Sequence, residues 1–245
     1  MKGNLCFLFI LLCSCQYFCS CVGEDIHTHK LVLQWPISFC NTGEFQCRNN
    51  VPDDDFTIHG LRHFNHNGNI LINCGGAPLG RDGLSDTTRR KLKSAWPNLK
   101  NGGRDIDFWG YQWSKHGSCS GLAEPTLYFE RALHLKSTCC STLFSHLKMI
   151  GFTPSASIPH TAGQIIDIIS EKVGQVPGIK CNTNTNNAHQ LLEITFCFDA
   201  RRHPMNCSSD ETYCPVKNVF FPSSKTLWWT RSNYCDYKPT YWGTL

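Results

Sequence analysis

The sequence predicts a single α+β domain cross-linked by disulfides. Segments with strand periodicity and segments with helix periodicity are mixed along the 245 residues, without the regular alternation that gives a parallel sheet. No internal repeat, long linker or block of like charge divides the chain. Eleven cysteines follow the first 23 residues. They indicate several disulfides formed in an oxidising compartment, with at least one thiol left over.

Two segments in the first third of the chain have strand patterns. The apolar run that ends at Pro36 predicts an early strand, because proline cannot donate to the ladder. At 55–61, apolar Phe56 and Ile58 alternate with polar residues. A strand there buries these two side chains and turns His59 to the opposite face.

The later elements are a strand at 191–199, a short strand at 218–222 and several helices. The first of these strands has its inward positions at Leu192, Ile194, Phe196 and Phe198. Helices are expected at 84–97, with Ser85 or Asp86 as the cap, at 105–117, at 125–151 with a break, and at 161–174.

Residues 1–23 have the pattern of a secretory signal peptide. Lys2 precedes an apolar run that is too short to span a bilayer, and small residues precede a predicted cleavage after Gly23. We therefore expect a secreted, extracellular protein that does not contact membranes. Removal of this leader leaves 22 Lys and Arg against 19 Asp and Glu, a net charge of +3, which permits a polyanionic partner without identifying one.

The stretch "FWGYQWSKHGSC" at 108–119 gathers groups suited to acid–base chemistry. On a helix ending near Gly117, Gln112, Lys115 and His116 share one face. The negative end of the helix dipole would favour protonated His116.

His59 could act as its partner, so that one imidazole takes a proton and the other gives one. A matching reaction is attack of the RNA 2′-hydroxyl on the adjacent phosphate. The alternative is that each histidine is an ordinary core or surface residue. No CxxC pair is present, so we expect neither a metal nor a cofactor.

"FTIHGL" at 56–61 together with "FWGYQWSKHGSC" resembles the two active-site segments of the ribonuclease T(2) family, the secreted base-nonspecific ribonucleases. The resemblance covers most of the chain after the leader and is greatest to the plant branch, which includes the self-incompatibility S-ribonucleases. It implies a central, mainly antiparallel sheet flanked by helices. It also implies cleavage of single-stranded RNA to 2′,3′-cyclic phosphates. His59 and His116 match the catalytic pair, with either order of acid and base open, and Lys115 matches the lysine that stabilises charge on phosphate.

This chain departs from the family pattern near the histidines. Gln112 stands where the family usually has Glu; it cannot exchange protons but can donate a hydrogen bond to phosphate. Arg62 replaces a tryptophan near the expected base site, and Tyr111 occupies the place of a third, binding histidine. We take Arg62, Tyr111, Trp35 and Trp109 as candidate substrate contacts, with core packing as the alternative for Trp35.

The resemblance also implies four disulfides. They join Cys40 to Cys47, Cys74 to Cys119, Cys181 to Cys214, and Cys197 to Cys207. The second would cross-link the two histidine segments and stabilise the fold by about 4 kcal/mol. We expect Cys235 to bond to Cys139 or Cys140. Asn206 begins a glycosylation sequon whose middle residue is one of the disulfide cysteines.

These features divide the chain into a leader at 1–23, a ribonuclease-like domain at 24–224 and an aromatic-rich extension at 225–245. The function they favour is a secreted, monomeric endoribonuclease, with a pistil self-incompatibility role and a pollen-side recognition protein as its partner. Two alternatives stay open: a non-catalytic RNA-binding or storage protein on the same scaffold, and a general defence or phosphate-scavenging plant ribonuclease.

Overall fold

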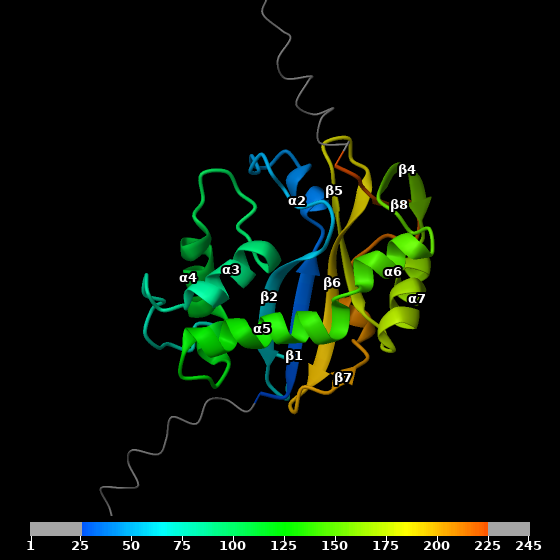
Figure 1. The fold of residues 1–245 in the computed structure, drawn as a ribbon. Coiled ribbons are helices and arrows are strands. Elements are labelled where there is room, and N and C mark those ends of the chain that lie inside the picture. Colours follow the sequence, from blue (N-terminus) through cyan, green and yellow to red (C-terminus); the bar gives the residue numbers. More distant parts are fainter. Residues whose placement is uncertain (1–25, 225–245) are drawn as a thin grey trace, which may run out of the picture.

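The computed structural model describes residues 26–224, which form one open sheet with helices packed around it (Figure 1). Its strands are β1 (Thr28–Gln34), β2 (Thr57–Phe64), β3 (Ile70–Leu71), β4 (Ser155–His160), β5 (Gly178–Thr183), β6 (His189–Asp199), β7 (Pro204–Met205) and β8 (Val219–Phe221). The main order is β3-β2-β1-β6-β8-β4, and β5 and β7 also pair with β6. Every pair is antiparallel except β6 with β8, which confirms the predicted α+β class. The predicted leader and the 225–245 extension lie outside the described residues.

The helices are α2 (Pro36–Cys40), α3 (Asp86–Ala95), α4 (Asp105–Lys115), α5 (Pro125–Cys140), α6 (Leu143–Met149) and α7 (Ala162–Val173), with short 3-10 turns at Gly117–Cys119 and Ser209–Glu211. In Figure 1, α5 crosses in front of the sheet, with α3 and α4 on one side of the molecule and α6 and α7 on the other. Ser85 caps α3 by accepting a hydrogen bond from the backbone N–H of Thr88, as the sequence predicted. No helix in residues 26–224 is long and apolar enough to cross a membrane.

Two details of the predicted elements were wrong. Pro36 ends β1 as expected, but it also starts the short helix α2, because proline is pre-organised for the first helical position. In β6 the fully buried leucine is Leu191, while Leu192 is half-buried. A register shift between β5 and β6 at Lys180 and Cys181 changes which side chain faces the core at this point.

The four bridges implied by the resemblance are present: Cys40–Cys47, Cys74–Cys119, Cys181–Cys214 and Cys197–Cys207. A fifth joins the neighbours Cys139 and Cys140 at the end of α5. The predicted bond from Cys235 to one of these two involves a residue outside the described part of the chain.

Candidate active site

His59 lies at an irregularity of β2. In the β1–β2 ladder, Val32 pairs with Gly60 and Leu33 pairs with Ile58, so His59 is the extra residue of a bulge. Ile58 is fully buried, while the His59 side chain keeps 32% of its exposure. The strand therefore buries its apolar residues and presents the imidazole on the other face, as predicted.

A carboxylate from β6 holds this imidazole. Nδ1 of His59 lies 2.6 Å from Oε1 of Glu193, which is only 5% exposed. Burial alone would raise the pKa of Glu193, but the hydrogen bond and charge of His59, with the charges of Lys180 and Arg62, lower it overall. Glu193 is thus a charged partner that fixes which nitrogen of His59 is free, namely Nε2.

The second histidine follows α4, whose position depends on two indole rings. Trp109 and Trp113 are buried, and their Nε1 groups donate to the carbonyl oxygens of Trp96 and Ala77. Gly117 lets the chain turn closely over this layer, because a Cβ there would lie 2.4 Å from the Trp113 ring. The helix ends at Lys115, so His116 is its C-terminal cap residue.

His116 is buried, with 6% exposure, and its Nδ1 has no hydrogen-bond partner among the described residues. Burial lowers the pKa of His116 to about 4, and the charges of Arg62, Lys115 and His59 act in the same direction. The expectation that the helix dipole would keep His116 protonated is therefore wrong. Desolvation, with the charges of Arg62 and Lys115, outweighs a helix end that contributes about 1 kcal/mol.

Three further side chains complete the cluster. Gln112 is buried, and its Oε1 lies 3.4 Å from where a Cβ on Gly60 would sit, so the helix approaches β2 where glycine leaves room. Lys115 donates a 2.8 Å hydrogen bond to the hydroxyl of Tyr111, which is 55% exposed. Arg62 is close enough for its charge to act on both His116 and Glu193. The structure thus brings together a carboxylate-paired imidazole, a neutral imidazole, an amide and two cations.

Comparison with known proteins identifies this arrangement. The model of the Ribonuclease T2 family matches residues 26–207. This chain belongs to the ribonuclease T2 family. The match covers most of the described chain and includes both histidine segments, so the protein is an endoribonuclease of the T2 type, a class that acts on single-stranded RNA.

Individual T2 relatives agree with the family match. The chain is 32% identical over 229 residues to intracellular ribonuclease LX of Solanum lycopersicum, covering 89% of this chain and 92% of the relative. It is 31% identical over 224 residues to ribonuclease S-7 of Nicotiana alata, covering 88% and 96%. The crystal structure of RNase NT in complex with 5′-AMP is 32% identical, with a TM-score of 0.70, over 82% of this chain and 100% of that one.

The other candidate substrate contacts of this T2 ribonuclease differ in burial, which decides whether they can touch RNA. Arg62 and Tyr111 border the histidine cluster and are not buried. Trp35 is fully buried, with its ring against Phe56, Phe144 and Phe221. Trp109 is also buried. The prediction that Trp35 and Trp109 contact substrate is therefore wrong, and the core alternative holds for Trp35.

Glu193 is a site residue that the sequence patterns did not predict. The residue stands in "LLEITFCFD" as one polar side chain in an apolar strand, and that was the available signal. A buried carboxylate requires a partner, but the sequence does not show that the partner is His59, 134 positions away.

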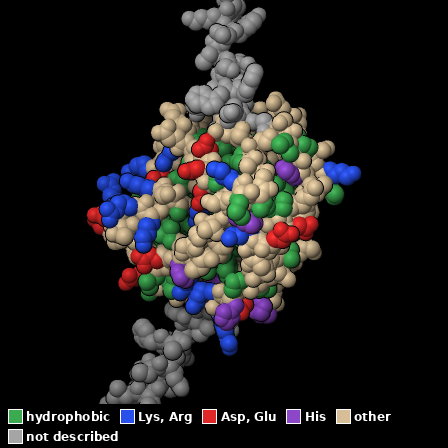
Figure 2. Space-filling view, turned by 45° about the vertical axis from the view of Figure 1, so that its right-hand side comes forward, with side chains coloured by type: hydrophobic (Ala, Val, Ile, Leu, Met, Phe, Trp, Pro, Cys, Tyr) green, Lys and Arg blue, Asp and Glu red, His purple; other side chains and the backbone are tan. Residues whose placement is uncertain are grey.

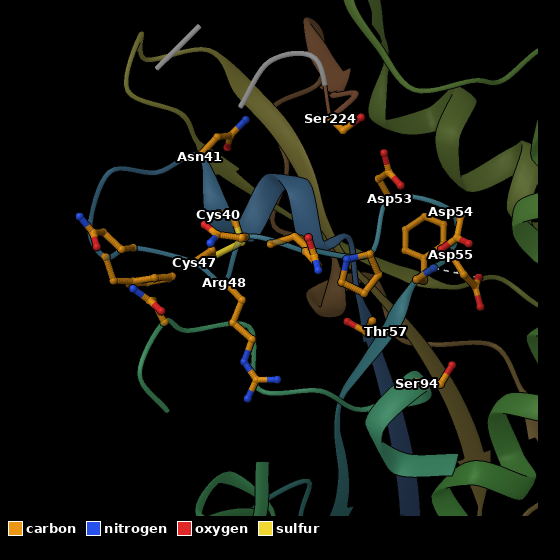
Figure 3. A pocket seen from close by; sticks show the side chains of 18 of the residues that line it. Cys40, Asn41, Cys47, Arg48, Asp53, Asp54, Asp55, Thr57, Ser94 and Ser224 are labelled. Carbon is orange, nitrogen blue, oxygen red and sulfur yellow. Dashed lines mark hydrogen bonds between the residues drawn. A yellow bond between two sulfur atoms is a disulfide. The ribbon is translucent and has the colours of Figure 1, made fainter. Parts of the chain in front are cut away.

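A separate hollow of about 1600 Å³ lies beside the Cys40–Cys47 loop. Figure 3 shows Asp53, Asp54 and Asp55 on one side of it and the disulfide on the other. Lys136 neutralises Asp55. The lining also includes Glu44, Arg48 and Lys93, so both signs of charge are present, and none of the residues of the histidine cluster lines this hollow.

No group of three or more His, Cys, Asp or Glu side chains within residues 26–224 is arranged to hold a metal ion. Asn206 is exposed, and its Oδ1 accepts a hydrogen bond from the backbone N–H of Val176. Glycosylation at Asn206 stays a prediction.

Proposed function

We propose that this T2 ribonuclease cleaves single-stranded RNA by transphosphorylation, with His116 as the general base and His59 as the general acid. The observation that carries the proposal is the opposite environment of the two rings. His116 is neutral at pH 7 because its pKa is about 4. Nδ1 of His59 instead lies 2.6 Å from the carboxylate of Glu193, which orients the ring and leaves Nε2 as the nitrogen that can deliver a proton.

The chemistry follows from these states. Nε2 of His116 accepts the proton of the 2′-hydroxyl, and the 2′-oxygen forms a bond to phosphorus. Nε2 of His59 donates its proton to the departing 5′-oxygen as the P–O5′ bond breaks. The products are a 2′,3′-cyclic phosphate and a free 5′-hydroxyl, and water later opens the cyclic ester with the two histidines in reversed roles.

The remaining polar groups stabilise the charge that develops on phosphate. In this proposal the amide of Gln112 donates to a phosphate oxygen, and Lys115 and Arg62 supply positive charge. Tyr111 holds the Lys115 ammonium by a hydrogen bond, so the lysine is positioned before substrate arrives.

The cleavage product tests the proposal. Purified protein incubated with a dinucleotide such as CpA should release cytidine 2′,3′-cyclic phosphate, seen by ³¹P NMR or chromatography. The analogue with a 2′-deoxyribose at the cleaved position should stay intact, because it lacks the nucleophile. Direct release of a 3′-phosphate without the cyclic species would contradict the mechanism, and so would cleavage of the deoxy analogue.

The amide at position 112 provides a second test. A Gln112→Glu change places a carboxylate beside His116, and a nearby negative charge favours the protonated ring. We expect the acid limb of the kcat/KM profile to move to higher pH, away from its position near pH 4 in the unchanged protein. The matched control is Gln46→Glu, on an exposed residue away from the histidines. An acid limb that stays in place would show that residue 112 does not act on His116.

We also propose that the protein is secreted. The leader at 1–23 and the five disulfides of the described chain support an oxidising compartment. The likeness to ribonuclease S-7 supports a self-incompatibility role with a pollen-side partner, whereas the likeness to ribonuclease LX supports a general plant ribonuclease. Restriction of the transcript to the pistil would separate the first from the second. The opposed histidine environments favour either of these over a storage or non-catalytic RNA-binding protein.

A further inference from the structure

A groove of about 730 Å³ lies between α5 and the turn that connects β6 to β7. Arg131 on α5 and Arg201 and Arg202 on the turn line it together. In Figure 1, α5 passes in front of the sheet and β7 lies below it. Figure 2 shows Lys, Arg and His side chains gathered at this lower end of the molecule. The groove therefore brings together cationic side chains from two segments, α5 and the β6–β7 turn.

These cations are not neutralised within the protein. Among residues 26–224, no carboxylate pairs with the guanidinium of Arg131, Arg201 or Arg202. Glu130 is the one acid that lines the groove, and it accepts a hydrogen bond from Thr88. Burial, with the charge of Arg202, lowers the pKa of Arg131. The like charges therefore oppose one another in the free protein, and an anion between them would relieve that repulsion.

The lining also includes apolar side chains, beside the polar His134 and Thr138. Leu127 is 47% exposed and lies on the α5 side, while the exposed Pro204 and the buried Phe198 lie on the sheet side. Guanidinium groups recognise phosphate oxygens in a bidentate manner, and apolar surface beside them suits the face of a nucleobase. A free inorganic anion would use the first feature and leave the second unused.

The groove is distinct from the histidine cluster. Between them lies a buried pair, His29 and His63, whose Nδ1 atoms are 2.8 Å apart. The pKa of His63 is lowered to about 3 by burial, by His29, by Arg131 and by His116. Arg131 and His116 thus both act on His63, but none of the residues of the histidine cluster lines the groove.

We propose that this groove, formed by Arg131, Arg201 and Arg202, is a second binding site for the phosphates of single-stranded nucleic acid, away from the cleavage centre. This inference rests on the proposed function in one respect, because the enzyme's own substrate is such a polyanion. The site adds affinity for long strands and takes no part in the chemical step. A dinucleotide held by the histidines does not depend on it.

The test uses a single-stranded deoxyoligonucleotide, which the intact enzyme can bind but cannot cleave for want of a 2′-hydroxyl. Arg131→Gln combined with Arg202→Asn removes two charges. Arg202 has a φ of 70°, and Asn adopts this left-handed conformation more readily than Arg. The matched control is Arg90→Gln, on α3, whose guanidinium donates a hydrogen bond to Thr87 and forms no ion pair within the described part of the chain.

We expect the double variant to bind the oligonucleotide about tenfold more weakly at 0.1 M salt, and the slope of log K against log salt to fall by about 1.4, since each lost contact on a single strand contributes about 0.7. The control should keep the affinity and slope of the unchanged protein. Dinucleotide turnover should be equal in all three proteins, which also shows that the double variant is folded. If the double variant is unfolded, Arg202→Asn alone is measured, with an expected change in slope of about 0.7.

The possible failures are distinguishable. Unchanged oligonucleotide affinity and slope in a folded variant would overturn the proposal. Inorganic phosphate could displace the oligonucleotide at a concentration equal to that of the oligonucleotide's phosphate groups. That result would mean that the groove binds the free anion and not a strand. If the unchanged protein does not turn over the dinucleotide, the proposed ribonuclease mechanism is wrong. The effect of the arginine substitutions on oligonucleotide binding still tests the groove.

Discussion

A His116→Ala variant should cleave a dinucleotide about 10²- to 10⁴-fold more slowly than the unchanged protein, because it lacks the group that removes the 2′-proton. His116 suits this task because its pKa of about 4 leaves it neutral over the whole range from pH 5 upward. The same pKa predicts the acid limb of the kcat/KM profile. Activity should rise with pH through about pH 4 and then level off, until the acid partner loses its proton.

The control for this variant is His189→Ala, on an exposed histidine at the start of β6. It should retain full turnover, which excludes a general effect of losing an imidazole. The measurement is initial rate against dinucleotide concentration, so that kcat and KM are obtained separately. A His116→Ala protein with more than half of the original kcat would remove His116 from the chemical step.

A Glu193→Gln variant should lower kcat by about 10- to 100-fold and move the alkaline limb of the pH profile to lower pH. The amide can still accept the hydrogen bond from Nδ1 of His59, so the ring keeps its orientation. It no longer supplies the negative charge that stabilises the imidazolium, and the general acid loses its proton more easily. Glu193 acts through His59 and is therefore a positioning residue.

The pH profile distinguishes this role from a purely structural one, since a packing defect would lower activity equally at all pH values. Glu193→Asp retains the charge on a shorter side chain, so it should restore the alkaline limb while leaving kcat partly reduced. Glu171→Gln, on the exposed face of α7, is the matched control and should change neither quantity. An unshifted alkaline limb in Glu193→Gln would show that the carboxylate does not control the proton on His59.

The sequence allowed much of the catalytic face to be predicted because local periodicity decides which way a side chain points. Phe56 and Ile58 had to face the core, so His59 had to face away. The spacing of Gln112, Lys115 and His116 likewise predicted that the three lie on one face of the helix. These inferences need only the geometry of a single strand or helix.

The parts that could not be predicted depend on neighbours distant in sequence. Glu193 meets His59 only because β1 lies between their strands and pairs with both. Trp109 lies in the second histidine segment and Trp35 directly follows β1, yet both are core residues, and composition does not distinguish an aromatic substrate contact from a core residue. The protonation of His116 was mispredicted because the helix dipole is a local property, whereas burial is a property of the whole fold.

The backbone at the bulge has a further implication. His59 is left out of the β1 ladder, and its carbonyl oxygen instead accepts a 3.2 Å hydrogen bond from the indole of Trp96, at the end of α3. The Trp96 indole thus supplies the hydrogen bond to the His59 carbonyl that a neighbouring strand would otherwise supply. The orientation of the His59 ring can therefore change as related sequences diverge, through substitutions that alter the packing around the Trp96 indole. Such a change leaves the pairing of the strands as it is.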